Sequence, residues 1–382
     1  MIYQSAVAII LALSLLNLAL NMRSLRVPAC TAVVPAPQPL VTIIVPARNE
    51  ETNIGRCVES LIKQDYPNFE VIVVDDNSED ETSSVVARLA GRDSRVHLIK
   101  GEPLPPGWAG KPHACMQAAR QAKGQWLLFT DADTTHSTDM LRRTLSIAME
   151  NRVALLSGFP RQVTERFSQK IPIPMIYFII MSWAPLWLLQ RSRKPIASVA
   201  IGQFLLFSSA AYWKIGGHES VKSRITEDLY LGANIARSGG RHLAVDLSDV
   251  VSCRMYNSFR AVWDGLTRSL YAVSSISFGA LLGLLVAGYV LFLGPFIWLL
   301  KMAFAFSVPL PWGALVITQA ALLFIMRGWV DARFKESLGS TLLYPLGIVF
   351  IIGVVLNGMA RRLSGAGVSW KKRTYDKGSS VE

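Results

Sequence analysis

The sequence VTIIVPARNE, residues 41–50, begins with a run of β-branched residues that stops at Pro46 and gives way to polar residues. Such a run, bounded by a turn-forming residue, predicts a buried strand. Apolar residues then recur at helical spacing between Ile54 and Ile62, which predicts a helix with one buried face. A buried strand followed by an amphipathic helix is the unit from which helix-covered parallel sheets are built.

The same pattern recurs further along the chain. Apolar runs at residues 71–74, 96–99 and 126–129 predict three more buried strands. Two of them end in acidic residues, at Asp75-Asp76 and at Asp131. We therefore predict an α/β fold with a mostly parallel sheet and helices on both faces, in which a ligand binds at the carboxyl ends of the strands.

The composition argues against an ordinary soluble enzyme. Of the 382 residues, 51% are hydrophobic and 17% are charged, which leaves room for several membrane helices beside one catalytic domain. The formal net charge of +12 is typical of proteins that meet nucleic acid or anionic lipid. Because the basic residues cluster beside apolar stretches, we expect a membrane partner and no nucleic acid. The four cysteines form no CxxC pair and suggest neither a zinc site nor a disulfide framework.

Four apolar stretches are long enough, or nearly so, to span a bilayer: 2–20, 274–300, 310–326 and 341–359. Basic residues follow the first, which predicts an uncleaved anchor in the cell (inner) membrane of a multi-pass protein with a cytoplasmic catalytic domain. Three further crossings would place the basic C-terminal tail outside, contrary to the positive-inside rule. Whether all three cross therefore stays open, and 310–326 is the shortest candidate.

Residues 171–190 lack charge and have the length of a span, but they contain three prolines and basic residues flank both ends. Candidate catalytic residues lie on both sides, and a single crossing would put Asp133 and Asp228 on opposite sides of the membrane. We therefore predict an interfacial or re-entrant segment. The expected anchor, stiff proline-rich linker, catalytic domain, transmembrane region and basic tail are residues 1–22, 23–39, 40–270, 271–360 and 361–382.

Asp131-Ala132-Asp133 follows the strand predicted at 126–129. Alternation along an extended backbone places residues i and i+2 on one face, so both carboxylates can point at one spot. Two carboxylates with open coordination positions suit Mg²⁺ or Mn²⁺, which also accept phosphate oxygens. His136 is a candidate for an additional ligand. The alternatives are a pair of solvated or capping acids, and a histidine that packs at a helix start.

Two turns after strands and one helix start carry further candidates. In Pro46-Ala47-Arg48-Asn49-Glu50, Glu50 could face a nucleotide and Arg48 its phosphates; the alternative is a plain strand-to-helix turn. Asp76 could accept hydrogen bonds from a ribose or a base, although acids at such positions also cap helices. Lys111, at a predicted helix start, could approach an anion or lie in solvent.

Thr226-Glu227-Asp228 opens another predicted helix. Asp228 could take a proton from an acceptor hydroxyl as a general base. The alternative is helix capping by Thr226 with acids in the first turn. Arg260 and Trp263 belong to a basic and aromatic cluster just before the stretch 274–300, where they could bind substrate or anchor the chain at the membrane interface.

Together these motifs resemble the family 2 glycosyltransferases, which have the GT-A fold. The resemblance covers residues 40–270 and rests on six motifs in the family's order: VPARNE (45–50), VVDDNS (73–78), Gly110-Lys111, Asp131-Ala132-Asp133, Gly216-Gly217-His218 and Thr226-Glu227-Asp228. The sequences LPPGWAGK (104–111) and WKKR (370–373) further resemble the membrane branch that includes hopanoid-associated and carotenoid glycosyltransferases.

The resemblance implies that Glu50 and Asp76, with Lys111, bind a nucleotide-sugar donor, with a UDP-linked sugar favoured. It implies a divalent ion, Mg²⁺ or Mn²⁺, held chiefly by Asp133 with Asp131, and an inverting displacement with Asp228 as the base. The remaining residues expected to bind substrate are Pro46, Arg48, Asp131, Glu227, Arg260 and Trp263.

The chain departs from the family's polymerising members in one place. Processive polysaccharide synthases carry Gln-x-x-Arg-Trp after Thr-Glu-Asp, whereas this chain has Arg260-Ala261-Val262-Trp263. We therefore predict the transfer of one sugar to a membrane lipid or isoprenoid acceptor. The alternatives are a polyprenyl-phosphate glycosyltransferase, a polysaccharide synthase and an inactive membrane scaffold.

Overall fold

The structure is a computed structural model that describes residues 2–34, 36–190, 192, 199–256, 258–272, 278–304, 309–364, 368–370 and 373–375. Basic residues that follow segment 171–190 (Arg191, Arg193 and Lys194) and that belong to the expected basic tail (Lys371, Lys372 and Lys377) lie outside the described residues.

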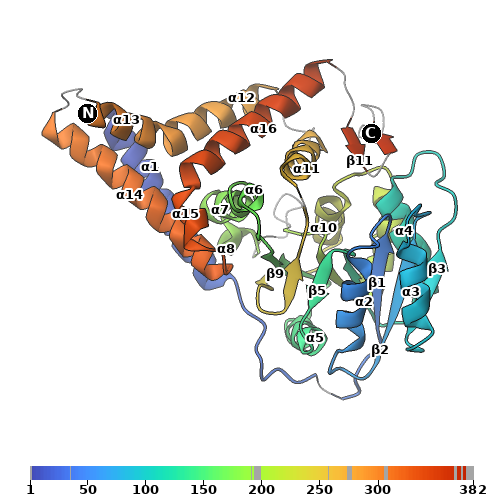
Figure 1. Ribbon diagram of the computed structural model, residues 1–382. Coiled ribbons are helices and arrows are strands. Elements are labelled where there is room, and N and C mark those ends of the chain that lie inside the picture. Colours follow the sequence, from blue (N-terminus) through green and yellow to red (C-terminus); the bar gives the residue numbers. More distant parts are fainter. Residues whose placement is uncertain are drawn as a thin grey trace. The chain divides into compact units, whose positions relative to one another are not determined.

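By its internal contacts the chain divides into two units, and Figure 1 labels many of their elements. The helical unit comprises Met1–Ser24, Thr164–Trp187 and Tyr256–Val368, and the α/β unit comprises Leu25–Val163, Leu188–Met255 and Ser369–Glu382. These limits differ from the expected domains, since residues 164–187 and 256–270 group with the apolar helices rather than with the sheet.

The α/β unit is built on a seven-stranded sheet of order β3-β2-β1-β4-β8-β6-β9. Its strands are β1 (Val41–Ala47), β2 (Phe69–Asp75), β3 (Val96–Lys100), β4 (Trp126–Thr130), β6 (Leu155–Phe159), β8 (Phe204–Ser208) and β9 (His242–Asp246). Strand β8 is antiparallel to both neighbours, β4 and β6, and the remaining pairs are parallel. The mostly parallel sheet is therefore confirmed, with the four predicted strands in place.

Helices cover both faces of this sheet. Ile43 belongs to a core with Val58 and Leu61 of α2, whereas its neighbour Ile44 belongs to a second core with Ala118 of α4. Successive side chains of one strand thus enter different cores, as the twofold alternation of a strand requires. The helical elements of the unit are α2 (Ile54–Ile62), α3 (Thr82–Ala90), α4 (Gly110–Gln121), α5 (Met140–Glu150), α9 (Ser209–Lys214), η2 (Gly217–Val221) and α10 (Glu227–Arg237).

A second, three-stranded sheet of order β5-β10-β7 adjoins the end of β4 in sequence. It consists of β5 (Thr134–His136), β10 (Val251–Cys253) and β7 (Arg161–Gln162). In the antiparallel pair of β10 with β5, Cys253 lies opposite Thr134, and in the parallel pair with β7 it lies opposite Gln162. The short strands β11 (Val368–Trp370) and β12 (Arg373–Tyr375) form a third sheet.

Side chains of α5 are hydrogen-bonded to the expected linker, 23–39. Arg143 donates to the carbonyl of Pro28 through Nε at 2.9 Å, and Arg142 donates to the carbonyl of Ala32 at 2.6 Å. The hydroxyl of Ser146 donates to the carbonyl of Val33 at 3.1 Å. Side chains of α5 thus donate hydrogen bonds to carbonyls of the linker, which lies outside helices and strands.

The helical unit contains four helices long and apolar enough to cross a membrane, among the residues that the structure describes: Ile2–Ser24, Leu281–Ala303, Leu310–Arg333 and Tyr344–Ser364. They confirm the predicted N-terminal and C-terminal membrane helices. The helix from Leu310 has 24 residues, so the stretch that was shortest in sequence becomes the longest helix. The elements of the unit are α1 (Ile2–Ser24), α6 (Phe167–Lys170), α7 (Ile173–Trp183), α11 (Phe259–Ala272), α12 (Phe278–Ala287), η3 (Gly288–Leu293), α13 (Gly294–Ala303), α14 (Leu310–Arg333), α15 (Leu338–Leu342) and α16 (Tyr344–Ser364). The short helix α8 (Leu186–Leu189) begins in this unit and ends in the α/β unit, whose segment starts at Leu188.

The ambiguous segment 171–190 is broken between α7 and α8, at Ala184-Pro185. Amides of α1 satisfy the carbonyls that the break frees. Asn21 donates through Nδ2 to the carbonyls of Met181 and Ala184, both at 2.7 Å, and Asn17 donates to that of Ser182 at 3.0 Å. An interrupted helix is tolerated in apolar surroundings only with such partners. The interfacial or re-entrant placement remains a prediction.

Candidate active site

The carboxyl ends of β1 and β2 are tied together by their backbones. The N–H of Asp76 donates to the carbonyl of Ala47 at 2.8 Å, and Arg48 donates through Nη1 to the carbonyl of Asp76 at 2.6 Å. Asn49 and Asn77 have φ values of 51° and 55°, the left-handed region that asparagine tolerates better than most residues. The first two motifs thus form adjoining turns at one edge of the sheet.

Two acidic side chains near these turns, those of Asp75 and Asp80, accept hydrogen bonds from different backbone N–H groups. The Oδ1 of Asp75 accepts the N–H of Ser78 at 3.0 Å, so this carboxylate closes its own turn. The Oδ1 of Asp80 accepts the N–H of Thr82 at the start of α3. Asp80 therefore serves the helix start, and Asp76 is buried at the strand end.

Glu50 lies in the turn between β1 and α2. Its Oε2 accepts a hydrogen bond from the side-chain amide of Asn53 at 2.8 Å, and its N–H donates to the hydroxyl of Thr82 at 2.8 Å. The backbone around Glu50 and the preceding Pro46, which lies within β1, is therefore well fixed. This placement is compatible both with a nucleotide-facing role and with the plain turn.

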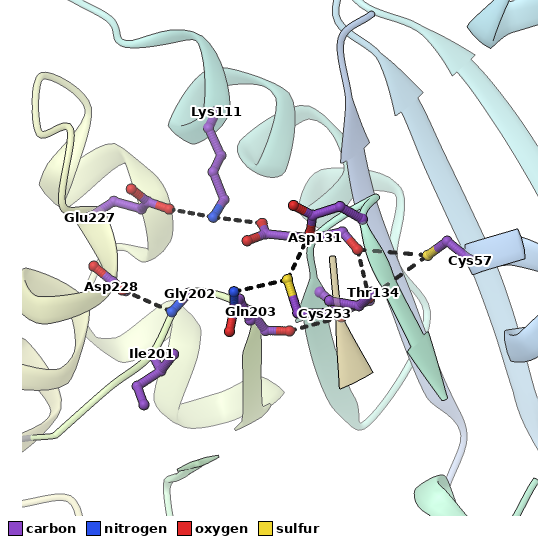
Figure 2. A network of polar contacts seen from close by, with 12 residues as sticks. Cys57, Lys111, Asp131, Thr134, Ile201, Gly202, Gln203, Glu227, Asp228 and Cys253 are labelled. Carbon is purple, nitrogen blue, oxygen red and sulfur yellow. Dashed lines mark hydrogen bonds and ion pairs between the residues drawn. The ribbon is translucent and has the colours of Figure 1, made fainter. Parts of the chain in front are cut away.

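Lys111 connects two acidic motifs, as Figure 2 shows. Its Nζ lies 2.8 Å from the Oδ1 of Asp131 and 2.9 Å from the Oε1 of Glu227. Lys111 is the second residue of α4, Asp131 directly follows β4, and Glu227 is the first residue of α10. The lysine side chain is 22% exposed, so the alternative of a lysine in solvent is wrong.

Two backbone amides hold the carboxylate of Asp228. The N–H of Gly202 donates to Oδ2 at 2.8 Å (Figure 2), and the N–H of Leu229 donates to Oδ1 at 2.9 Å. A Cβ on Gly202 would lie 3.2 Å from that Oδ2 and 3.1 Å from the Nζ of Lys111. The side chain of Thr226 makes no capping bond to α10, so the capping alternative is wrong for this residue.

Asp133 lies in a turn, and the argument from strand alternation is wrong here. β4 ends at Thr130, and the N–H of Thr134 returns to the carbonyl of Asp131 at 3.2 Å. The turn gives the two carboxylates different partners, because Asp131 pairs with Lys111 whereas the Oδ1 of Asp133 accepts a hydrogen bond from the thiol of Cys253 at 3.4 Å.

The cluster holds more acid than base, and this shifts its pKa values. Burial raises the pKa of Asp133, and the Asp131 carboxylate raises it further. Burial likewise raises the pKa values of Glu227 and Asp228, against an opposing effect of Lys111. Burial opposes the charge of Lys111, but the carboxylates of Asp131 and Glu227 outweigh it and hold its pKa well above the usual value.

Asp131 and Asp133 could supply part of the ligand set of a divalent cation. Asp131 and Asp133 supply hard oxygen ligands, and a cation would relieve the unfavourable charge on Asp133. No group of three or more His, Cys, Asp or Glu side chains among the described residues has the arrangement of a complete metal site. The remaining ligands of a Mg²⁺ or Mn²⁺ ion would therefore come from a phosphate-bearing substrate and water.

His136 is a structural residue. Its Nδ1 lies 3.2 Å from the hydroxyl of Ser60 and its Nε2 lies 3.2 Å from that of Thr130. Burial lowers the pKa of His136 to about 3, so the ring is neutral at ordinary pH. Both ring nitrogens face hydroxyl groups, and His136 ends β5 rather than beginning a helix.

Arg260 and Trp263 belong to α11 of the helical unit. Trp263 packs against Phe350 of α16, with ring centroids 5.3 Å apart, and lies close to Gly353. The Arg260 side chain is 92% exposed and lies 3.7 Å from the carboxylate of Asp264. Their described contacts stay within the helical unit, and their role in substrate binding stays a prediction.

Sequence reasoning missed three residues of this site: Gly202, Gln203 and Cys253. Gln203 donates through Nε2 to the Sγ of Cys253 at 2.9 Å, which brings the residue before β8 and the end of β10 to the Asp133 turn. A lone cysteine and a Gly-Gln pair carry no periodic signal. Only the fold brings them to the acidic cluster.

The family model of the glycosyl transferase family 2 matches residues 42–216 of the chain. This confirms the resemblance of the motifs to that family. Within that class the chain is similar to the 4,4'-diaponeurosporenoate glycosyltransferase of Staphylococcus aureus, with 31% identity over 233 residues in strain USA300 and over 237 residues in strain MRSA252. Each match covers 60% of this chain and 60% of the relative's length.

A solved structure supports the GT-A fold. The mannosyltransferase of Pyrobaculum calidifontis, in complex with GDP-Man and Mn²⁺, superimposes with a TM-score of 0.53 at 21% identity. The match covers 94% of this chain and 99% of that protein. The predicted fold class is thereby confirmed, and so is the resemblance to the carotenoid glycosyltransferases.

Proposed function

We propose that this protein is a membrane-bound inverting glycosyltransferase that transfers one sugar from a nucleotide-sugar to a lipid-like acceptor. The observation that carries the proposal is the contact of Lys111 with Asp131 and Glu227, beside the amide-held carboxylate of Asp228, in a family 2 domain. A cation that contacts two carboxylates, beside a third that backbone amides hold, suits a site that binds a diphosphate and moves a proton.

Different residues of the chain bind the nucleotide, contact the diphosphate and hold the metal ion. Glu50 and Asp76 bind the nucleotide at the edge formed by β1 and β2, and Lys111 contacts the diphosphate. Asp131 and Asp133 would hold Mg²⁺ or Mn²⁺, which supplies positive charge to the departing diphosphate. The mannosyltransferase with a similar fold was solved with a nucleotide-sugar, GDP-Man, and with Mn²⁺.

Asp228 acts on the acceptor. Its carboxylate is fixed by the amides of Gly202 and Leu229, and a fixed carboxylate can take the proton of an acceptor hydroxyl as that oxygen attacks the anomeric carbon. The C–O bond to the diphosphate breaks on the opposite face, and the configuration inverts. The proton moves to Asp228 and the electron pair to the leaving diphosphate.

The acceptor is expected to come from the membrane. Four candidate membrane helices favour a membrane protein, and we propose the inner membrane with the α/β unit in the cytoplasm. The relatives are named for diaponeurosporenoate, an apolar carboxylate. If the acceptor of this protein is also a carboxylate, it attacks without a proton to lose, and Asp228→Asn retains much of the activity.

The proposal is tested on membranes that contain the full chain, with Mg²⁺ or Mn²⁺ and a panel of radiolabelled nucleotide-sugars. Label is then counted in an organic-solvent extract. We expect extractable label that disappears with Asp133→Ala. Label that appears only in insoluble polymer would instead favour a polysaccharide synthase, and no transfer from any donor would contradict the proposal.

A further inference from the structure

Cys253 lies directly against the second carboxylate of the acidic turn. Its Sγ is 3.4 Å from the Oδ1 of Asp133, to which the thiol donates. The backbone holds the two residues in register, because the N–H of Arg254 donates to the carbonyl of Asp133 at 3.0 Å and Cys253 lies opposite Thr134 in the sheet. The main chain and the side chain of Asp133 therefore both accept hydrogen bonds from residues at the end of β10.

Gln203 fixes the direction of the thiol, as Figure 2 shows. Its Nε2 donates to the Sγ of Cys253 at 2.9 Å, so the sulfur accepts from the amide and donates its own hydrogen to Asp133. The amide is itself held, because its Oε1 accepts from the Nε2 of Gln162 at 3.0 Å. The carbonyl of Gln203 accepts the hydroxyl of Thr130 at 2.9 Å. Gln203, Cys253 and Gln162 are all buried.

We propose that Cys253, oriented by Gln203, is a positioning residue that presets the Asp133 carboxylate for a divalent cation. The inference rests on the proposed function in one respect, namely the assignment of Asp131 and Asp133 as the site of the divalent cation. Groups that hydrogen-bond to metal-ligating carboxylates fix the orientation of those ligands and raise metal affinity. A thiol is a weak, neutral donor. It therefore restrains one oxygen of Asp133 without cancelling the charge that attracts the cation.

The restraint also explains why a buried cysteine, rather than a lysine or arginine, suits this position. A cationic partner would neutralise Asp133 and would compete with a metal ion. The neutral chain Gln162–Gln203–Cys253 holds the carboxylate through dipoles alone.

The test is the binding of Mn²⁺ alone to the purified full-length protein, measured from the electron paramagnetic resonance signal of free Mn²⁺. Asp133→Asn identifies the site by its loss of binding. Cys253→Ala is expected to weaken binding by about tenfold. Cys253→Ser, which keeps a donor, is expected to fall between Cys253→Ala and the wild type, and Gln203→Met to weaken binding in the same direction by less.

Cys115→Ala is the matched control, because Cys115 is a buried thiol of α4 in the same unit, packed in the apolar core. The proposal is overturned if Cys253→Ala binds Mn²⁺ as the wild type does, if Cys115→Ala weakens binding equally, or if Asp133→Asn leaves it unchanged. Should Cys253→Ala fail to fold, Cys253→Ser and Gln203→Met decide the question. Mn²⁺ binding does not require sugar transfer, so failure of the proposed function would be seen separately in the transfer assay.

Discussion

The Nζ of Lys111 lies 2.8 Å from the Oδ1 of Asp131, and this ion pair joins the start of α4 to the end of β4. On its other side the ammonium group contacts Glu227 of α10 at 2.9 Å. Three motifs that are far apart in sequence thus share one cation. Because the lysine and Asp131 side chains are 22% and 29% exposed, an anionic ligand can reach the pair.

Lys111→Met is expected to lower kcat/KM by about a hundredfold, because it removes the cation that contacts the departing diphosphate. Lys111→Arg should retain more activity. Lys214→Met is the control, since Lys214 is exposed on α9 and donates to the carbonyl of Ser238. Steady-state rates with the donor found in the transfer assay provide the comparison. Equal activity of Lys111→Met and Lys214→Met would refute the role of Lys111.

The pH dependence should report the raised pKa of Asp228. Burial raises this pKa above 3.8, and the base acts only when it is deprotonated. Activity should therefore be lost on acidification at a pH above 3.8, and regained as the pH rises through the folded-state pKa. A profile of kcat/KM against pH measures this. A profile that stays flat down to about pH 4, near the ordinary value for aspartate, would show that Asp228 does not act as the base.

Gly202→Ala should reduce kcat with little effect on stability. The added Cβ would lie 3.1 Å from the Nζ of Lys111 and 3.2 Å from the Oδ2 of Asp228, so both groups must shift by a few tenths of an ångström. Displacement of a fixed base costs about tenfold or more in rate. Gly55→Ala is the matched control, because its Cβ would make only ordinary contact with Val85, at 3.4 Å. Similar kcat values for the two variants would contradict the close approach.

Stability at acid pH should depend on His218. The hydroxyl of Tyr212 lies 2.8 Å from its Nδ1, and burial lowers the pKa of His218 from 6.5 to about 3. Below pH 6.5 the unfolded chain takes up a proton that the folded chain refuses, so the free energy of unfolding falls as the pH drops towards 3. The slope is about 1.4 kcal/mol per pH unit for one such group.

Thermal unfolding of wild type and His218→Gln at about pH 7 and about pH 4.5 checks this account. The variant should lose less of its unfolding midpoint on acidification than the wild type, even if it is less stable at neutral pH. An equal drop in both proteins would mean that His218 takes up its proton without unfolding.

Asn21→Leu should destabilise the helical unit by about 1–3 kcal/mol, because it leaves buried polar groups of the chain break without partners. Asn21 accepts the N–H of Trp187 at 3.0 Å besides donating to two carbonyls. Leu13→Ala, on the exposed face of the same helix, is the control. Unfolding midpoints of the detergent-solubilised proteins compare the two. A smaller effect for Asn21→Leu than for Leu13→Ala would contradict the bonding role of α1.

Much of the sheet could be predicted, because buried parallel strands appear in the sequence as short apolar runs. The runs at 41–45, 71–74, 96–99 and 126–129 all lie in strands. The antiparallel direction of β8 could not be predicted, since an apolar run carries no orientation. Strands β5, β7 and β10 have two or three residues, too few for any periodicity to appear.

The candidate site was predictable where motifs mark strand ends and helix starts, as at Asp131, Lys111 and Glu227. It was not predictable where long-range pairing brings residues together. Cys253 and Asp133 are 120 residues apart in sequence, and their contact depends on the register of β10 with β5. The strand-alternation argument for Asp133 failed because a turn replaces extended backbone at that point.

The central claim is that this cluster catalyses a single displacement of one sugar onto a membrane acceptor, with Asp228 as the base for a hydroxyl. The most direct measurement is the structure of the product formed by the purified protein, with its anomeric configuration determined by nuclear magnetic resonance. The account predicts a lipid that carries one sugar whose configuration is opposite to that in the donor. A product with the donor's configuration retained, or a sugar polymer, would contradict it.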